Sequence, residues 1–220
     1  MADDFLSDRE QEEALRDWWR ENWRWIIGGV VLGLALLAGW RYWEVYRDQR
    51  AAEAAKLYAE FQGALQTRDV DQATRLLTDL TQKHEGSAYA QQGRLLLAKT
   101  HVDGGKFDEA VALLQSVTAQ ADDDELAQLA RLRTARLFIQ QGKYDDALKL
   151  LDAESAGAFA AQVREIRGDA LVAKGEDDGA RAEYAAALAA NTDAQIDRTM
   201  LERKLQDVGG VAAGPAQGQP

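Results

Sequence analysis

The segments GKFDEAVALL (105–114) and GKYDDALKLL (142–151) carry the same glycine, lysine, aspartate, alanine and closing leucine pair at matching positions. Weaker copies are RDVDQATRLL (68–77) and GEDDGARAEY (175–184). The shared alanine recurs at intervals of 37, 37 and 33 residues, at Ala73, Ala110, Ala147 and Ala180. A period in the mid-thirties is typical of a helix–turn–helix repeat. The sequence therefore predicts an all-α fold built from stacked helical hairpins.

The glycine in three of the copies and the aspartate in all four have structural roles. A glycine ends the first helix in a left-handed turn, which other residues adopt at a cost. The glycines at this position are Gly105, Gly142 and Gly175. An aspartate in the first turn of the second helix complements the positive end of the helix dipole. These aspartates are Asp71, Asp108, Asp145 and Asp178.

Small and large residues alternate at fixed offsets from the shared alanine. A small residue twelve positions upstream lets the two helices cross closely, in the pairs Ala98 and Ala110, Ala135 and Ala147, and Gly168 and Ala180. A large residue follows each alanine by four positions, at Leu77, Leu114, Leu151 and Tyr184. The first copy has Phe61 at the small position, so we expect its hairpin to pack differently. This pattern resembles the tetratricopeptide repeat and predicts an α-solenoid over 44–208, whose first helix, 44–66, runs on from the segment before it.

That preceding segment contains the uncharged run WIIGGVVLGLALLAGW, residues 25–40. The 21 residues from Trp23 to Trp43 would form a helix of roughly 31 Å, close to the ~30 Å hydrocarbon thickness of a bilayer. Arg24 lies one position and Arg41 two positions inside these limits, where they can reach the headgroups. We expect a transmembrane helix over 23–43, preceded by a leader over 1–22.

Aromatic residues flank this run, and all 6 tryptophans of the chain lie in or beside it. Tryptophan and tyrosine prefer the membrane interface, where the ring meets acyl chains and the polar atom meets water. We therefore expect contact with the lipid bilayer through Trp23, Arg24, Trp25, Trp40, Arg41, Tyr42 and Trp43.

Two alternatives explain the apolar run less well. A core helix of a small soluble domain would rarely be uniformly apolar over this length with aromatic residues at both ends. A cleaved signal peptide would have a basic leader, whereas this leader is more acidic than basic, and Leu36 would occupy the –3 position of a cut after Ala38. An uncleaved signal anchor fits better.

Charge does not decide the orientation of the anchor. The basic residues near it are Arg9, Arg16, Arg20 and Arg24 on one side and Arg41, Arg47, Arg50 and Lys56 on the other. Because these numbers are equal, the positive-inside rule favours neither topology. A cytoplasmic leader with a translocated repeat domain is permitted, since long domains cross largely regardless of charge.

The leader has the pattern of an amphipathic helix that could lie along a membrane surface. Ser7 and Glu10 match a capping box, and Leu15, Trp18, Trp19 and Trp23 then share one face. A fraying acidic tail explains the same residues equally well.

A last helix is expected over 193–207. Its possible N-caps are Asn191, Thr192 and Asp193. Its apolar stripe would consist of Ile196, Met200, Leu201 and Leu205. The segment GGVAAGPAQGQP, residues 209–220, has too few apolar side chains to pack and is predicted to be a flexible tail.

Composition and motifs give no indication of an enzyme or a cofactor. A net charge of -11 repels phosphate backbones and disfavours nucleic acid, and the absence of cysteine excludes thiolate chemistry. Neither His84 nor His101 has a partner at metal-ligand spacing, and packing explains His101. The acidic residues 122–125 are typical of a helix start, with a weak cation site as the sharper alternative.

Three stretches together resemble the YfgM family, the ancillary subunit of the SecYEG translocon in proteobacteria. These are EQEEALRDWWREN (10–22), GWRYW (39–43) directly after the anchor and RGDALVAKGEDDGAR (167–181). The resemblance extends to about residue 207, and the Gly/Pro-containing tail and the tryptophan-rich leader depart from the family pattern. It implies an inner-membrane location with a cytoplasmic N-terminus and a periplasmic repeat domain. It also implies partners, namely the translocon and the periplasmic chaperone PpiD, and no catalytic residues.

Three functions can be compared on the sequence. An adaptor of the translocon is favoured, a generic membrane-tethered scaffold of another cell-envelope or cytoplasmic complex comes second, and an enzyme with an unrecognised site comes last. Stacked helix pairs form a concave surface that usually binds peptides or partner helices, an analogy at the level of the fold. The sequence does not indicate which side chains line that surface.

Overall fold

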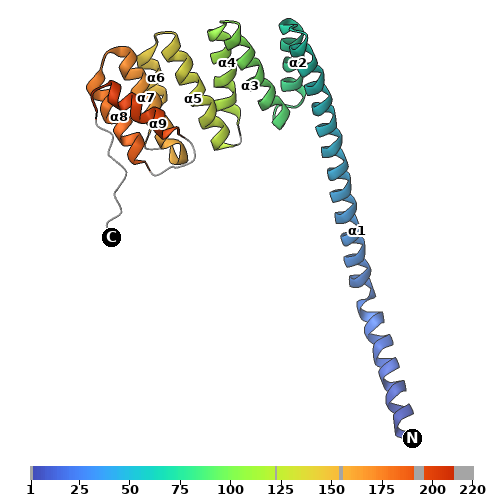
Figure 1. Ribbon diagram of the computed structural model, residues 1–220. Helices are drawn as coiled ribbons and strands as arrows, with labels where there is room; N and C mark the ends of the chain where they lie inside the picture. Colours follow the sequence, from blue (N-terminus) through green and yellow to red (C-terminus); the bar gives the residue numbers. More distant parts are fainter. Residues whose placement is uncertain (1, 122, 154–155, 191–195, 211–220) are drawn as a thin grey trace, which may run out of the picture. The chain divides into compact units, whose positions relative to one another are not determined.

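The computed structural model describes residues 2–121, 123–153, 156–190 and 196–210, and within these ranges every regular element is a helix (Figure 1). The helices are α1 (Ala2–Gln66), α2 (Val70–Lys83), α3 (Ala88–Asp103), α4 (Phe107–Gln120), α5 (Asp124–Gln140), α6 (Tyr144–Leu150), the short 3₁₀ helix η1 (Gly157–Phe159), α7 (Ala160–Lys174), α8 (Asp177–Ala189) and α9 (Arg198–Asp207). The predicted all-α fold is confirmed. The chain divides into two compact units, of which the first ends at Glu53 and the second begins at Ala54.

The first unit is the N-terminal part of α1. This helix is long and apolar enough to cross a membrane, and its apolar stretch is not buried against other parts of the chain. The rings of Trp23, Trp25, Trp40, Tyr42 and Trp43 are exposed. Arg24 is exposed as well, and Arg41 pairs with Glu44 at 2.8 Å. The bilayer limits at residues 23 and 43 stay a prediction.

The predicted helix start at Ser7 is wrong. The residue at an N-cap has non-helical backbone angles, whereas α1 is already helical from Ala2. At its other end α1 reaches Gln66, where the continuation of the anchor helix was expected to stop.

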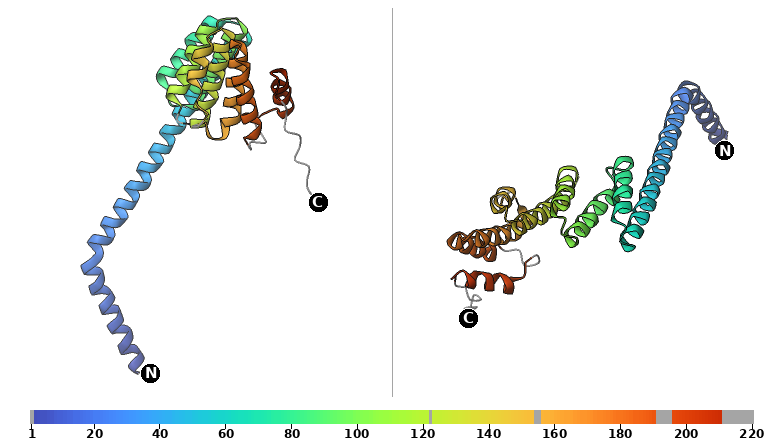
Figure 2. Two further views of the ribbon diagram at one scale, coloured as in Figure 1. Left: turned by 90° about the vertical axis from the view of Figure 1, so that its left-hand side faces the viewer. Right: turned by 90° about the horizontal axis from the view of Figure 1, so that it is seen from above.

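In the second unit, the helices pack in chain order as antiparallel neighbours (Figures 1 and 2). Four connected groups of buried side chains form its core, and each group draws on successive helices. Ala98, Ala110 and Leu114 lie in one group, and Ala135, Ala147 and Leu151 lie in another. All six of these side chains are buried. Such local packing between neighbours is typical of a solenoid.

The last hairpin, α7 and α8, packs through Gly168, Ala180 and Tyr184, all buried. A Cβ built on Gly168 would lie 2.6 Å from Cδ1 of Tyr184, and Cε1 of the same ring would be closer still. The absence of a side chain at Gly168 therefore lets α7 and α8 cross over the tyrosine ring.

The turns between paired helices share one geometry. Gly105, Gly142 and Gly175 have φ angles of 72°, 74° and 84°. The next residue donates its N–H to a carbonyl five positions back, as Lys106 does to His101 at 2.8 Å and Lys143 does to Phe138 at 2.8 Å. These are the bonds of a Schellman turn. The first copy has the same turn without glycine, because Arg68 adopts a φ of 61°.

The first hairpin also differs at the crossing point. Phe61 of α1 is fully buried, so it cannot provide the small residue that the other hairpins use. A Cβ on Gly93 of α3 would lie 2.6 Å from Cδ1 of Leu77, which shows that α3 approaches α2 closely at Gly93 instead. Sequence reasoning did not identify this glycine, because it falls five positions before the repeated small residue Ala98.

The last helix is shorter than predicted. It begins at Arg198, and the Asp197 side chain caps it by accepting the N–H of Met200 at 3.1 Å. Leu201 and Leu205 are buried as expected, but Met200 is exposed, so its place in the apolar stripe is wrong. The three cap candidates at 191–193 lie outside the described residues.

The end of the last helix also differs from the expected tail. Gly209 has a φ of 76°, and Gly210 donates its N–H to Leu205 at 2.8 Å, so both residues belong to the turn that closes α9. The remainder of the predicted tail, 211–220, lies outside the described residues.

Lys204 of α9 joins the last helix to α7. Its Nζ lies 2.7 Å from Glu165 and 2.8 Å from Asp169, and the Tyr184 hydroxyl donates to Asp169 at 2.8 Å. Burial acts to lower the pKa of Lys204, but the hydrogen bonds to Asp169 and Glu165 outweigh it and the pKa is raised. Burial, followed by the bond to Asp169, raises the pKa of Tyr184. Lys204 therefore stays charged and Tyr184 stays neutral at neutral pH.

His101 is buried on α3, in agreement with the packing role predicted from the sequence. Burial lowers the pKa of its imidazole, Glu109 acts to raise it, and Lys106 acts to lower it. A base whose pKa is lower in the folded chain binds fewer protons there than in the unfolded chain. The imidazole therefore does not change the free energy of unfolding well above its ordinary pKa of 6.5. It lowers that free energy as the pH falls below 6.5.

We expect His101→Gln to lose less stability on acidification than the original chain. Between pH 7.5 and 5.5 the difference should be below about 1.4 kcal/mol, because the unfolded imidazole takes up its proton around pH 6.5 and one proton contributes at most about 1.4 kcal/mol per pH unit. Urea unfolding of both chains in neutral detergent, followed by circular dichroism, measures it. Identical pH dependence in the two chains would contradict a lowered pKa.

Candidate partner-binding groove

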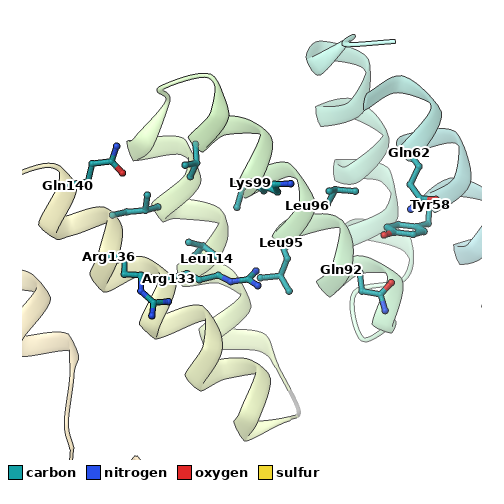
Figure 3. A pocket seen from close by; sticks show the side chains of 13 residues that line it. Tyr58, Gln62, Gln92, Leu95, Leu96, Lys99, Leu114, Arg133, Arg136 and Gln140 are labelled. Atoms are coloured by element: carbon teal, nitrogen blue, oxygen red, sulfur yellow. The ribbon is translucent and has the colours of Figure 1, made fainter. Parts of the chain in front are cut away.

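The second unit contains an open groove of about 740 Å³ between α1, α3, α4 and α5 (Figure 3). It is lined by Tyr58, Gln62, Gln92, Leu95, Leu96, Ala98, Lys99, Val102, Leu114, Arg133, Arg136, Leu137 and Gln140. This volume is within the usual range of ligand pockets, about 300–1,000 Å³. Of the residues predicted for repeat packing, Ala98 and Leu114 also line the groove.

The two ends of the groove differ in chemistry (Figure 3). Tyr58 and Gln62 of α1 and Gln92 of α3 lie at one end, and the Tyr58 ring packs against Tyr89 with centroids 5.5 Å apart. Leucines of α3 and α4 form the middle. At the other end, Arg133 and Arg136 extend from α5, and Arg133 reaches toward α3. The groove thus has an aromatic and amide end, an apolar floor and a cationic end.

Three cations line the groove: Lys99, Arg133 and Arg136. No lining residue is acidic, and Lys99, Arg133 and Arg136 form no ion pair with any residue that the structure describes. By contrast, Arg167 pairs with Glu183 at 2.7 Å outside the groove. Cations beside an apolar surface with no acidic residue in its described lining favour a negatively charged partner.

Two of the groove cations occupy the same position in the repeat, directly after the small packing residue of their helix. Lys99 comes directly after the small residue Ala98, and Arg136 comes directly after Ala135. The equivalent residue in α7 is Asp169, which follows Gly168. Because residues three or four apart share a helix face, the groove side of α3 is Gln92, Leu95, Leu96, Lys99 and Val102. Sequence reasoning missed these residues, although this offset from the packing position could have identified them.

No metal-binding cluster is present among the described residues, where no group of three or more histidine and acidic side chains comes together. The acidic residues 123–125 instead start a helix, as the sequence favoured. Asp123 caps α5 by accepting the N–H of Glu125 at 2.9 Å, and Asp124 and Glu125 lie in its first turn. The groove has the chemistry of non-covalent recognition, with apolar, amide and cationic contacts.

The family model of the tetratricopeptide repeat-like domain matches residues 16–210, which is most of the chain. The chain belongs to the tetratricopeptide repeat-like domain family. In this tetratricopeptide repeat-like chain, the matched region includes the whole groove and most of α1.

Two relatives carry the same name, "Ancillary SecYEG translocon subunit". The protein from Escherichia coli is 29% identical over 93% of this chain and 98% of its own length. The protein from Haemophilus influenzae is 29% identical over 39% of this chain, and the match spans only 41% of that relative's length. These matches confirm the resemblance to the family of ancillary translocon subunits.

Among solved structures, the tetratricopeptide repeat-like chain is similar to BtubC (BKLC) from P. vanneervenii. That likeness has a TM-score of 0.49 at 16% identity and covers 73% of this chain and 82% of the other.

Proposed function

We propose that this chain is a non-enzymatic adaptor of the SecYEG translocon, anchored in the inner membrane by the apolar part of α1. The observation that carries the proposal is the combination of an apolar helix and an open groove in a chain alignable with 98% of a relative named as a translocon subunit. The apolar helix would hold the repeat domain near the channel, and the groove would bind a partner.

In this proposal the N-terminus is cytoplasmic and the repeat domain is periplasmic. The repeat domain would then meet emerging chains and link translocation to a PpiD-like chaperone. Equal numbers of basic residues on the two sides of the anchor leave both topologies open, so the orientation is part of the proposal.

Site-specific photocrosslinking in native membranes tests the adaptor function. A crosslinking amino acid at Tyr46, next to the anchor, should give adducts with SecY, and one at Gln92, in the groove, should give adducts with a periplasmic chaperone. The matched control is Thr78 on α2, which is exposed and does not line the groove. The absence of any translocon adduct from Tyr46 would contradict the proposal.

A C-terminal reporter separates the adaptor from the generic scaffold. Alkaline phosphatase fused after residue 220 should be active, since that enzyme needs the oxidising periplasm. An active cytoplasmic reporter at the same position, with inactive phosphatase, would favour a scaffold on the cytoplasmic side instead.

A further inference from the structure

We propose that the groove binds an amphipathic helix of a partner protein that has carboxylates beside its apolar stripe. The inference deepens the proposed function, because it rests on the groove being the surface that recruits partners. It names the chemistry of the partner segment, which neither the anchor nor the relatives' names specify.

The first argument is charge complementarity. The cations Lys99, Arg133 and Arg136 lie beside the apolar floor and form no ion pair with a described residue, and none of the described residues that line the groove is acidic. A carboxylate bound beside these cations would interact with them more strongly as the partner helix displaced water from the groove. A neutral or basic segment would leave the cations without partners when it covered them.

The second argument comes from the chain's own last helix. Asp169 occupies the position in α7 that Lys99 occupies in α3 and Arg136 occupies in α5. Lys204 of α9 supplies the opposite charge, with its Nζ 2.8 Å from Oδ1 of Asp169. The same helix buries Leu201 and Leu205 against this end of the solenoid. At the last repeat, therefore, an amphipathic helix docks with an apolar stripe and a charge that complements this position.

The groove repeats this arrangement with the signs reversed. Two cations, Lys99 in α3 and Arg136 in α5, occupy the position that Asp169 occupies in α7. The α3 leucines Leu95 and Leu96 line the open groove and are partly exposed. A helix placed there would bury apolar side chains spaced three and four residues apart, as in other helix-in-groove complexes. Its flanking acids would face Lys99 and Arg136.

Fluorescence anisotropy of labelled peptides with the full chain in neutral detergent micelles tests the inference, with protein-free micelles as the blank. The probe is a 16-residue peptide with leucines at helical spacing flanked by glutamates. We expect it to bind about tenfold more tightly than the same peptide with glutamine in place of glutamate. A lysine version and a glutamate version with scrambled leucines should both bind more weakly.

The double variant Arg133→Gln/Arg136→Gln should bind the glutamate peptide about tenfold more weakly than the original chain does. Its affinity for the glutamine peptide should be unchanged. The matched control is Arg75→Gln/Arg203→Gln, which removes two exposed arginines outside the groove and should change nothing. Lys99→Gln gives a second groove variant. Circular dichroism establishes that each variant is folded.

Three results would overturn the inference. These are equal binding of the glutamate and glutamine peptides, an equal loss in the control variant, and displacement of the peptide by an equal concentration of short-chain phosphatidylglycerol. The last result would mean that the groove recognises anionic lipid. If the crosslinks to SecY from Tyr46 persisted in any of these cases, the proposed function would stand without the inference.

Discussion

Replacing Leu32, Leu34 and Leu36 with arginine is expected to move the chain from the membrane fraction to the aqueous fraction. These side chains are exposed on the first unit, where no part of the chain covers them. Each arginine near the centre of a bilayer costs about 3 kcal/mol on insertion scales, and each lost leucine removes a favourable contribution as well. Together the three changes oppose insertion by about 10 kcal/mol.

Ultracentrifugation of lysates after carbonate extraction measures this effect. The control variant carries arginine at Gln49, Gln66 and Gln72, which lie outside the apolar run and are exposed, so it should stay in the membrane pellet. If the Leu-to-Arg variant remained resistant to carbonate, α1 would not be the membrane anchor.

Gly168→Ala should destabilise the repeat domain by about 2 kcal/mol. The added methyl would lie 2.6 Å from Cδ1 of Tyr184. That ring is buried, and its hydroxyl is held by Asp169 at 2.8 Å, so it has little freedom to move aside. Overpacking of this kind costs up to about 3 kcal/mol, and the higher helix propensity of alanine offsets about 1 kcal/mol.

Urea unfolding followed by circular dichroism in neutral detergent gives the difference in free energy of unfolding. Gly63→Ala is the matched control, because a Cβ at Gly63 of α1 meets nothing within 4 Å. That variant should be as stable as the original chain or more stable by up to about 1 kcal/mol. Similar stabilities for the two variants would show that the crossing of α7 and α8 does not depend on Gly168.

Much of the fold could be predicted because its determinants are local. A glycine in a left-handed turn, an aspartate in the following first turn and a small residue twelve positions before an alanine all lie within one hairpin. The structure has positive φ angles at Gly105, Gly142 and Gly175, and Ala110 and Ala147 are fully buried. Local determinants of this kind recur with the repeat, so they can be read from a single sequence.

The remaining features depend on contacts between hairpins or on departures from the repeat. Arg68 takes the left-handed conformation that glycine takes elsewhere, which no local rule predicts. Met200 matched the apolar spacing of α9, but the direction in which that helix docks leaves it exposed. The groove was missed as a site because its cations come from α3 and α5, which only the stacking of hairpins brings together. The repeat offset alone places Lys99 and Arg136 at equivalent positions without showing that they share a groove.

The walls of the groove belong to consecutive hairpins and to no single one of them. In a solenoid each interface contributes a small rotation, so the span between Tyr58 at one end and Gln140 at the other adds up several such rotations. A change in any of these rotations is therefore expected to alter the width of the groove and the fit of a ligand. Such a change would not require any hairpin to unfold, because it is distributed over the interfaces between hairpins.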